Sequence, residues 1–195
     1  MKATAPVLLA STSAYRRELL GRLGLAFEAI APGVEESPRA DELPVDRALR
    51  LALEKAHSVA ARHPEALVIG SDQVAACAET LLEKPGSAAR CREQLAFLSG
   101  RSARFHTACA VLAPSSGVNL AHVDTTTVSF RRLSEAEIAR YVERERPYDC
   151  AGGFKAESLG ISLFEAIETQ DPSALIGLPL VWLAGALRSA GYLVP

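Results

Sequence analysis

The chain lacks most of the features that would identify its class at once. Its four cysteines show no CxxC spacing, which argues against a paired zinc site and against a disulfide framework. The apolar run at residues 7–10 is too short for a signal-peptide core, and the run at residues 174–187 is too short for a membrane span. No GxxxxGK[ST] or GxGxxG motif is present, so P-loop and Rossmann dinucleotide binding are excluded. We therefore expect a cytoplasmic protein with reduced thiols and no membrane partner.

The chain also has little excess charge. Its 21 lysines and arginines oppose 23 acidic residues, for a formal net charge of −2, and the basic residues are scattered among acids. This distribution argues against nucleic acid as a partner. Hydrophobic residues make up 49% of the chain, which excludes extensive disorder. With 195 residues, the chain is expected to form one domain over residues 1–195.

Hydrophobic periodicity predicts an alternation of strands and helices. The expected strands cover residues 7–10, 27–30, 67–70, a long hairpin over 105–130, and 161–164. The expected helices cover residues 14–23, 45–60, 87–100, 134–145 and 179–191. Ser134 and Glu137 form a capping box at the start of the fourth helix. We predict an α/β fold with a mixed twisted sheet, flanking helices, and two lobes around a cleft.

The first predicted strand is followed by a polar cluster at a helix N-terminus. Ser13 follows two further hydroxyl residues and precedes Arg16 and Arg17. Free backbone N–H groups, hydroxyls and guanidinium groups together favour an anion site, above all for phosphate. The alternative is an ordinary N-cap with two solvated arginines.

A second group of polar residues carries acids and lysines. Asp72 follows an apolar strand, where a carboxylate can hold a divalent cation or take a proton from water. Taken alone it is equally well explained as a turn-forming residue, and Glu36, Lys55 and Lys84 as solvated charges. In combination with the two arginines, this set suits a metal-bound polyphosphate rather than an acyl group.

Several blocks of the sequence together resemble one family, the Maf-like nucleotide pyrophosphatases. The matching blocks are residues 9–20 (LASTSAYRRELL), 34–36 (VEE), 55–56 (KA), 71–74 (SDQV), 83–86 (EKPG), 150–157 (CAGGFKAE) and 171–180 (DPSALIGLPL). They occur in order and span nearly the whole chain. The Gly-Gly pair in the sixth block allows two interpretations, a backbone that approaches a base or phosphate and a tight turn.

The resemblance implies a fold similar to the inosine triphosphate pyrophosphatases. It also implies hydrolysis of a nucleoside triphosphate to the monophosphate and diphosphate with a divalent metal cation, Mg or Mn. Carried over by position, Ser13, Arg17 and Lys55 would bind the substrate. Asp72 would be the proton acceptor and, with Glu36, hold the metal. Lys84 would bind the triphosphate and join them in catalysis; a homodimer is left open.

Three further positions bear on the base that the substrate carries. Tyr15, Gln73 and Glu157 resemble the branch of the family that acts on N7-methyl-GTP (m7GTP). Methylation at N7 makes the purine cationic, so Tyr15 could bind it by a cation–π contact and Glu157 could supply a counter-charge. The alternative is a surface aromatic and a solvated acid.

The match departs from the family pattern at three positions. Ala14 stands where the family usually has Pro, Tyr15 where this branch most often has Trp, and Ser158 where Gly is usual. Tyr is a weaker cation–π partner than Trp, which bears on base preference but not on reaction type. The competing hypotheses are a dTTP/UTP pyrophosphatase and a nucleotide-binding regulator of cell division or septum formation.

Overall fold

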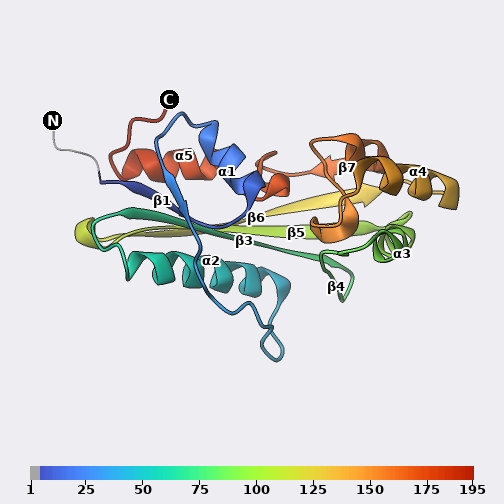
Figure 1. Cartoon of the computed structure of the whole chain (residues 1–195), viewed down its shortest axis with the longest axis horizontal. Helices are drawn as coiled ribbons and strands as arrows, with labels where there is room; N and C mark the ends of the chain where they lie inside the picture. Colours follow the sequence, from blue (N-terminus) through green and yellow to red (C-terminus); the bar gives the residue numbers. More distant parts are fainter. Residues whose placement is uncertain (1–4) are drawn as a thin grey trace. The chain divides into compact units, whose positions relative to one another are not determined.

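Seven strands form one mixed sheet in the computed structural model, which describes residues 5–195 (Figure 1). The strands are β1 (Val7–Ala10), β2 (Glu28–Ile30), β3 (Leu67–Cys77), β4 (Thr80–Leu82), β5 (Ser102–Ala113), β6 (Val118–Phe130) and β7 (Phe164–Glu168). Their order is β2-β1-β3-β5-β6-β7, with β4 paired to β3 outside this path. β1 runs parallel to β2 and β3, whereas β4 and β7 are antiparallel to their partners β3 and β6. The predicted mixed α/β class is confirmed.

The five predicted helices are present, with ends close to those expected. They are α1 (Ala14–Gly21), α2 (Pro44–Ala60), α3 (Ala88–Leu98), α4 (Glu135–Glu145) and α5 (Leu180–Ser189). The side chains of Ser13, Ser87 and Ser134 cap α1, α3 and α4 by accepting a backbone N–H three residues later. The capping box predicted at the start of α4 is confirmed.

The chain divides into two compact units. Unit 1 consists of residues 5–73, 107–124 and 171–195, and unit 2 of residues 74–106 and 125–170. Helices α1, α2 and α5 belong to unit 1, and α3 and α4 to unit 2. None of the helices in the described residues has the length and hydrophobicity that a bilayer crossing would require.

Unit 1 is built in three layers. Along β1 the buried side chains alternate, because successive residues of a strand point to opposite faces of the sheet. Val7 and Leu9 belong to the apolar core shared with α1 and α5, whereas Leu8 and Ala10 belong to the core shared with α2. Figure 1 shows α1 and α5 on one face of these strands and α2 on the other.

Unit 2 has a core of four aromatic rings. The ring of Phe154 lies 5.3 Å from that of Phe105, 5.6 Å from that of Phe130 and 4.9 Å from that of Phe164. All three contacts are edge-to-face, the arrangement that the ring quadrupoles favour. The rings join the hairpin β5–β6, strand β7 and the glycine-rich turn before Phe154.

The Gly-Gly pair is explained by a tight turn. Gly152 and Gly153 both have positive φ, in the region that only glycine enters readily. A Cβ atom on Gly152 would lie 2.9 Å from the Phe154 ring, and one on Gly153 would lie 2.9 Å from Sγ of Cys91. Both glycines therefore fit a tight turn that packs within unit 2, as the second interpretation expects.

Two predicted strand boundaries are wrong. We expected a strand to end before Asp72, but β3 continues to Cys77, so this carboxylate lies inside the strand. Beyond Gln73 the extension is apolar, and its residues 75–77 pair with β4, an element that the sequence pattern did not indicate. The strand expected at residues 161–164 is a 3-10 turn over Leu159–Leu163, and β7 begins only at Phe164.

Candidate functional site

The site begins with an unusually close approach of helix α2 to strand β3. A Cβ atom on Gly70 would lie 2.3 Å from the carbonyl oxygen of Ala52 and 2.7 Å from the backbone nitrogen of Ala56. Only glycine fits between strand and helix here. Lys55 is adjacent to this contact on α2, and Asp72 is two residues from Gly70 on β3, on the same face of the strand.

This approach creates a buried ion cluster. Nζ of Lys55 lies 2.6 Å from Oδ1 of Asp72 and 2.5 Å from Oε1 of Glu36. The Lys55 and Asp72 side chains are 6% and 9% exposed, whereas that of Glu36 is 56% exposed. Within the described chain, Oδ2 of Asp72 accepts no hydrogen bond. Three residues that the sequence analysis selected are thus brought together, with one carboxylate oxygen left open.

Two arginines of α2 hold the loop that carries Glu36. Arg47 donates to the backbone carbonyl of Glu36 at 2.9 Å, and Arg50 donates to the carbonyl of Ser37 at 3.2 Å. Arg50 also donates through Nε and Nη2 to the two carboxylate oxygens of Glu42, at 2.5 and 2.7 Å. These bonds lower the pKa of Glu42 to about 2. The loop is therefore fixed to the helix that supplies Lys55.

The N-terminus of α1 supplies further cationic groups, but its two arginines differ. Nε of Arg16 donates to the carbonyl of Gly177 at 2.9 Å, and the side chain is partly buried. Burial lowers the pKa of Arg16, while the nearby charges of Asp72 and Glu36 oppose that shift. In the described residues its Nη groups donate to no protein acceptor, whereas Arg17 is exposed.

Arg16 is thus the functional candidate that the sequence analysis did not carry over. The motif itself does not rank two adjacent arginines, because each is a cation at the N-terminus of the same helix. The signal that could have separated them is helical spacing. Arg16 lies three and four residues before the buried Leu19 and Leu20, on the side of the helix that faces the core.

The motif at residues 171–180 organises this corner of unit 1. The carbonyl of Gly177 accepts from Arg16 and also from Oγ of the buried Ser71, at 3.0 Å. Asp171 is buried and accepts from the backbone N–H of Val181, in the first turn of α5, at 2.7 Å. Its other oxygen accepts from the backbone N–H of Ser173 at 3.0 Å. The acid therefore caps α5 and shapes the turn that offers the Gly177 carbonyl.

Gln73 is tied to the same segment. Its Nε2 donates to Oγ1 of Thr107 at 2.8 Å and lies 3.1 Å from the carbonyl oxygens of Ala174 and Leu175. Thr107 itself donates to the Ala174 carbonyl at 2.9 Å. The amide group predicted to bear on specificity is therefore engaged with protein on its donor side.

The remaining predicted residues are distributed over the two units. Ser13 caps α1 by accepting from the backbone N–H of Arg16, at 3.4 Å, and Tyr15 is half-buried in the first turn of that helix. Lys84 and Glu157 belong to unit 2 and are both exposed. The structure therefore joins Lys55, Asp72 and Glu36 directly and leaves the roles of Lys84 and Glu157 as predictions.

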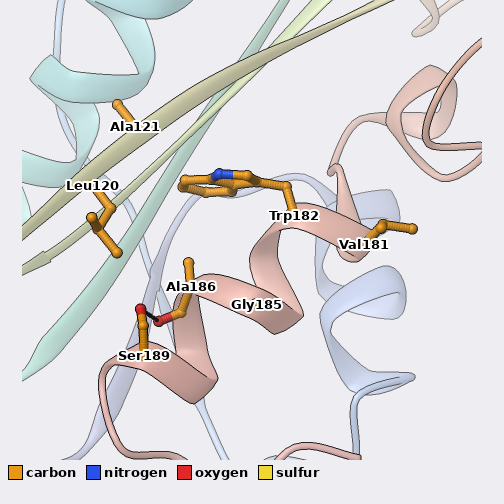
Figure 2. Close-up of a pocket in the computed structure, with 7 residues that line it drawn as sticks. All are labelled: Leu120, Ala121, Val181, Trp182, Gly185, Ala186 and Ser189. Carbon is orange, nitrogen blue, oxygen red and sulfur yellow. Dashed lines mark hydrogen bonds between the residues drawn. The ribbon is translucent and has the colours of Figure 1, made fainter.

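Unit 1 also has an apolar surface pocket of about 360 Å³ between β6 and α5 (Figure 2). Its lining side chains are Leu120, Ala121, Val181, Trp182, Ala186 and Ser189. Trp182 stacks on the ring of His122, with centroids 5.3 Å apart. No charged side chain lines this pocket, so it is unsuited to a triphosphate, in contrast to the ion cluster.

The carboxylates of the ion cluster have the chemistry that a small divalent cation requires. Asp72 and Glu36 converge on the same ammonium group, and carboxylate oxygens are the ligands that Mg²⁺ and Mn²⁺ prefer. Mg²⁺ sites commonly use one or two carboxylates and complete their coordination with water and substrate phosphates. No group of three or more His, Cys, Asp or Glu side chains suited to a metal occurs among residues 5–195. The pair therefore fits a cation that arrives with a phosphorylated ligand.

Comparison with known proteins finds relatives over nearly the full chain. A relative from Xanthomonas oryzae pv. oryzae (strain MAFF 311018), named 7-methyl-GTP pyrophosphatase, is 53% identical over 189 residues, covering 97% of this chain and 98% of its own. A protein of the same name from Aromatoleum aromaticum is 51% identical, with 97% of each chain covered. Among solved structures, the Staphylococcus aureus Ham1 protein matches 65% of this chain and 72% of its own, with a TM-score of 0.47 and 14% identity. The family profile of the Maf-like proteins matches residues 6–190. The chain belongs to the Maf-like protein family.

Proposed function

We propose that this protein is a nucleoside triphosphate pyrophosphatase that hydrolyses m7GTP to N7-methyl-GMP and diphosphate. The observation that carries the proposal is the buried cluster of Lys55, Asp72 and Glu36 beside the partly buried Arg16. The names of the relatives, at about half identity over nearly the full chain, support the substrate.

Asp72 is the proton acceptor in this proposal. Its Oδ1 accepts from Lys55, so the carboxylate is oriented and its negative charge is partly balanced. The other oxygen, Oδ2, is open and can take a proton from the water that attacks the anhydride between the α- and β-phosphoryl groups. Lys55 therefore acts as the group that orients the base, rather than as a solvated surface lysine.

The cationic groups of α1 bind the polyphosphate. Arg16 is fixed through Nε by the Gly177 carbonyl, so its Nη groups can donate in parallel to phosphate oxygens. The helix N-terminus and Ser13 add further donors. Arg17 and Lys84 are exposed cations that the family resemblance assigns to the same task.

A divalent cation, Mg²⁺ or Mn²⁺, would be held by Asp72 and Glu36. When bound, it supplies positive charge that balances the phosphate oxygens. Displacement of the Lys55 ammonium from Glu36 would free an oxygen for this purpose, and the exposure of Glu36 makes that side accessible.

Tyr15 and Glu157 select the base in this proposal. Tyr15 offers an aromatic face to the cationic methylated purine, and Glu157 a negative charge. Gln73 contributes indirectly, because its donor group holds the segment at residues 174–175. The site of action in this proposal is the cytoplasm, where buried thiols such as those of Cys77, Cys91 and Cys109 stay reduced.

The test is diphosphate release from m7GTP, GTP, dTTP, UTP and CTP, each with Mg²⁺ or Mn²⁺. We expect kcat/KM for m7GTP to exceed that for every other nucleotide by at least about tenfold. Preference for dTTP or UTP would retain the reaction and reject the substrate. Binding without release from any nucleotide would reject the enzyme and favour the regulator. Sedimentation of the same preparation determines whether it is a homodimer.

A further inference from the structure

Glu157 lies in the loop at residues 155–160 of unit 2. Glu157 is exposed, and in the described part of the chain its carboxylate takes part in no hydrogen bond or ion pair. The direction in which Glu157 points is therefore set by the backbone on either side of it. The contacts that fix this backbone therefore determine the position of the Glu157 carboxylate.

Helix α4 holds the loop at three points. Oε2 of Glu145 accepts from Oγ of Ser158 at 2.8 Å and from the backbone N–H of Leu159 at 3.0 Å. Oε1 of Glu145 lies 3.7 Å from Nζ of Lys155. One turn earlier on the helix, the hydroxyl of Tyr141 accepts from the backbone N–H of Lys155 at 3.1 Å. Contacts to α4 thus lie on both sides of Glu157, two residues before it at Lys155 and directly after it at Ser158.

The loop is also closed on itself, so it moves as one piece. A Cβ atom on Gly160 would lie 2.3 Å from the carbonyl oxygen of Lys155, which means that the two ends of the loop are in contact. The backbone N–H of Ser158 donates to the same carbonyl at 3.3 Å. A change at the Glu145 carboxylate is therefore transmitted to the position of Glu157.

The place of Glu145 in α4 shows that it does not serve the helix. It is the last residue of α4, where the negative end of the helix dipole disfavours a carboxylate. Its side chain is nevertheless 11% exposed and accepts two hydrogen bonds from the loop. The electrostatic cost at the helix end is offset only by the loop contacts, so removal of this acid relieves the helix and releases the loop.

We infer that Glu145 is a positioning residue for base selection: it holds the Glu157 loop in the conformation that discriminates the methylated purine. The inference rests on the proposed function, because it assumes that Glu157 acts on the base. It adds a residue that contacts neither substrate nor metal and that acts through the loop.

The test compares kcat/KM for m7GTP and GTP in the wild-type protein and in five variants. Glu157→Gln measures the role of the presented charge, and Glu145→Ala releases the loop. Glu145→Gln keeps an oxygen that can accept from Ser158 and Leu159. Ser158→Ala removes one contact and leaves Glu145 intact. Glu143→Ala, an exposed acid on the same helix, is the matched control.

We expect Glu145→Ala to lower the m7GTP/GTP ratio by about tenfold, the size of effect that loss of hydrogen bonds to a charged group produces. Glu145→Gln restores most of the ratio, Ser158→Ala lowers it less, and Glu143→Ala leaves it unchanged. Hydrogen exchange at the Leu159 amide accelerates in Glu145→Ala, since that N–H loses its acceptor.

The failures of the two proposals are separable. A wild-type protein that does not prefer m7GTP refutes the proposed function and with it this inference. A Glu157→Gln variant with an unchanged ratio leaves the proposed reaction intact but refutes the role of Glu157, and this inference falls with that role. If Glu157→Gln lowers the ratio while both Glu145→Ala and Ser158→Ala keep it within about twofold of wild type, Glu145 is only structural and the inference is overturned. If Glu145→Ala does not fold, Ser158→Ala alone decides by the same criterion.

Discussion

The two units bury different chemistry. Among the described residues, every buried charged side chain (Lys55, Asp72, Asp124 and Asp171) lies in unit 1. Unit 2 has Thr126 as its buried polar residue and a core of four phenylalanine rings. Burial of a charged group costs free energy unless the group is paired, and unit 1 buries charged groups at several positions.

The difference concerns the cores, because unit 1 buries charged groups whereas the core of unit 2 is apolar. In unit 1 the buried polar groups orient one another, as Lys55 does for Asp72 and the Gly177 carbonyl for Arg16. In unit 2 apolar packing and the contacts of Glu145 support an exposed loop. Substitutions in unit 1 are therefore expected to act mainly on chemistry, and core substitutions in unit 2 mainly on stability.

The largest effect is expected from Asp72→Asn. The amide cannot accept the proton from water, so kcat for m7GTP falls by about 10²–10⁴. The fold persists because Lys55 keeps Glu36 as a partner. Diphosphate release measures kcat, and thermal unfolding measures the stability of the fold. The control is Asp46→Asn, at an exposed position on α2. Retention of more than about a tenth of wild-type kcat contradicts the assignment of the base.

Phe154→Ala in unit 2 is expected to lower stability rather than to act on the chemistry. Loss of a buried ring that contacts three others lowers the free energy of unfolding by about 3–5 kcal/mol. Phe97→Ala is the control, because that ring is half-buried and lies 4.5 Å from the Arg101 guanidinium, and loss of this contact costs about 1 kcal/mol. Equal losses in a urea titration would show that the four rings are not the core of this unit.

Gly70→Ala tests the link between packing and chemistry in unit 1. The added methyl group forces α2 away from β3, which costs about 1–3 kcal/mol and moves Lys55 from Asp72. We expect lower stability together with a lower kcat. Gly21→Ala at the end of α1 meets open space and is expected to stabilise the protein by about 0.4–1 kcal/mol. A Gly70→Ala variant with wild-type kcat would separate the helix contact from the site.

The smallest effect concerns acid stability and is expected in both units. The pKa of Glu42 is lowered to about 2 by its hydrogen bonds to Arg50, and that of Glu137 to about 2 by the Ser134 backbone and hydroxyl. A lowered folded-state pKa stabilises the protein above the ordinary value of 4.5, and this contribution is lost as the pH falls from 4.5 towards 2. Denaturation between pH 5 and pH 2 should show a shallower loss in Glu42→Gln and Glu137→Gln. An unchanged slope in either variant contradicts its role.

Elements with strong local signals were predictable. The amphipathic pattern predicted α2, the capping box predicted the start of α4, and alternation predicted the β5–β6 hairpin. In each case the residues that determine the element lie within it or next to it. The extension of β3 and the short β4 were missed, because each is stabilised by pairing with the other rather than by its own pattern.

For the candidate site, too, the residue types were predictable but their long-range contacts were not. The chemical types of Asp72, Glu36 and Lys55 could be selected from the sequence, but their contact depends on the close approach at Gly70. Helical spacing places Arg16 on the core side of α1, but the direction of its guanidinium depends on Gly177, far away along the chain. Local periodicity carries no information about such long-range partners.

The Gly177 carbonyl has a consequence for the order in which the protein matures during synthesis. Its two donors, Arg16 and Ser71, precede it by 161 and 106 residues. Both leave the ribosome well before their acceptor, so the guanidinium has no fixed direction while the remainder of the chain is still being translated. Contacts of such long sequence separation form late. The nascent protein therefore fixes the direction of the Arg16 guanidinium only after the residue-171–180 segment has emerged and docked.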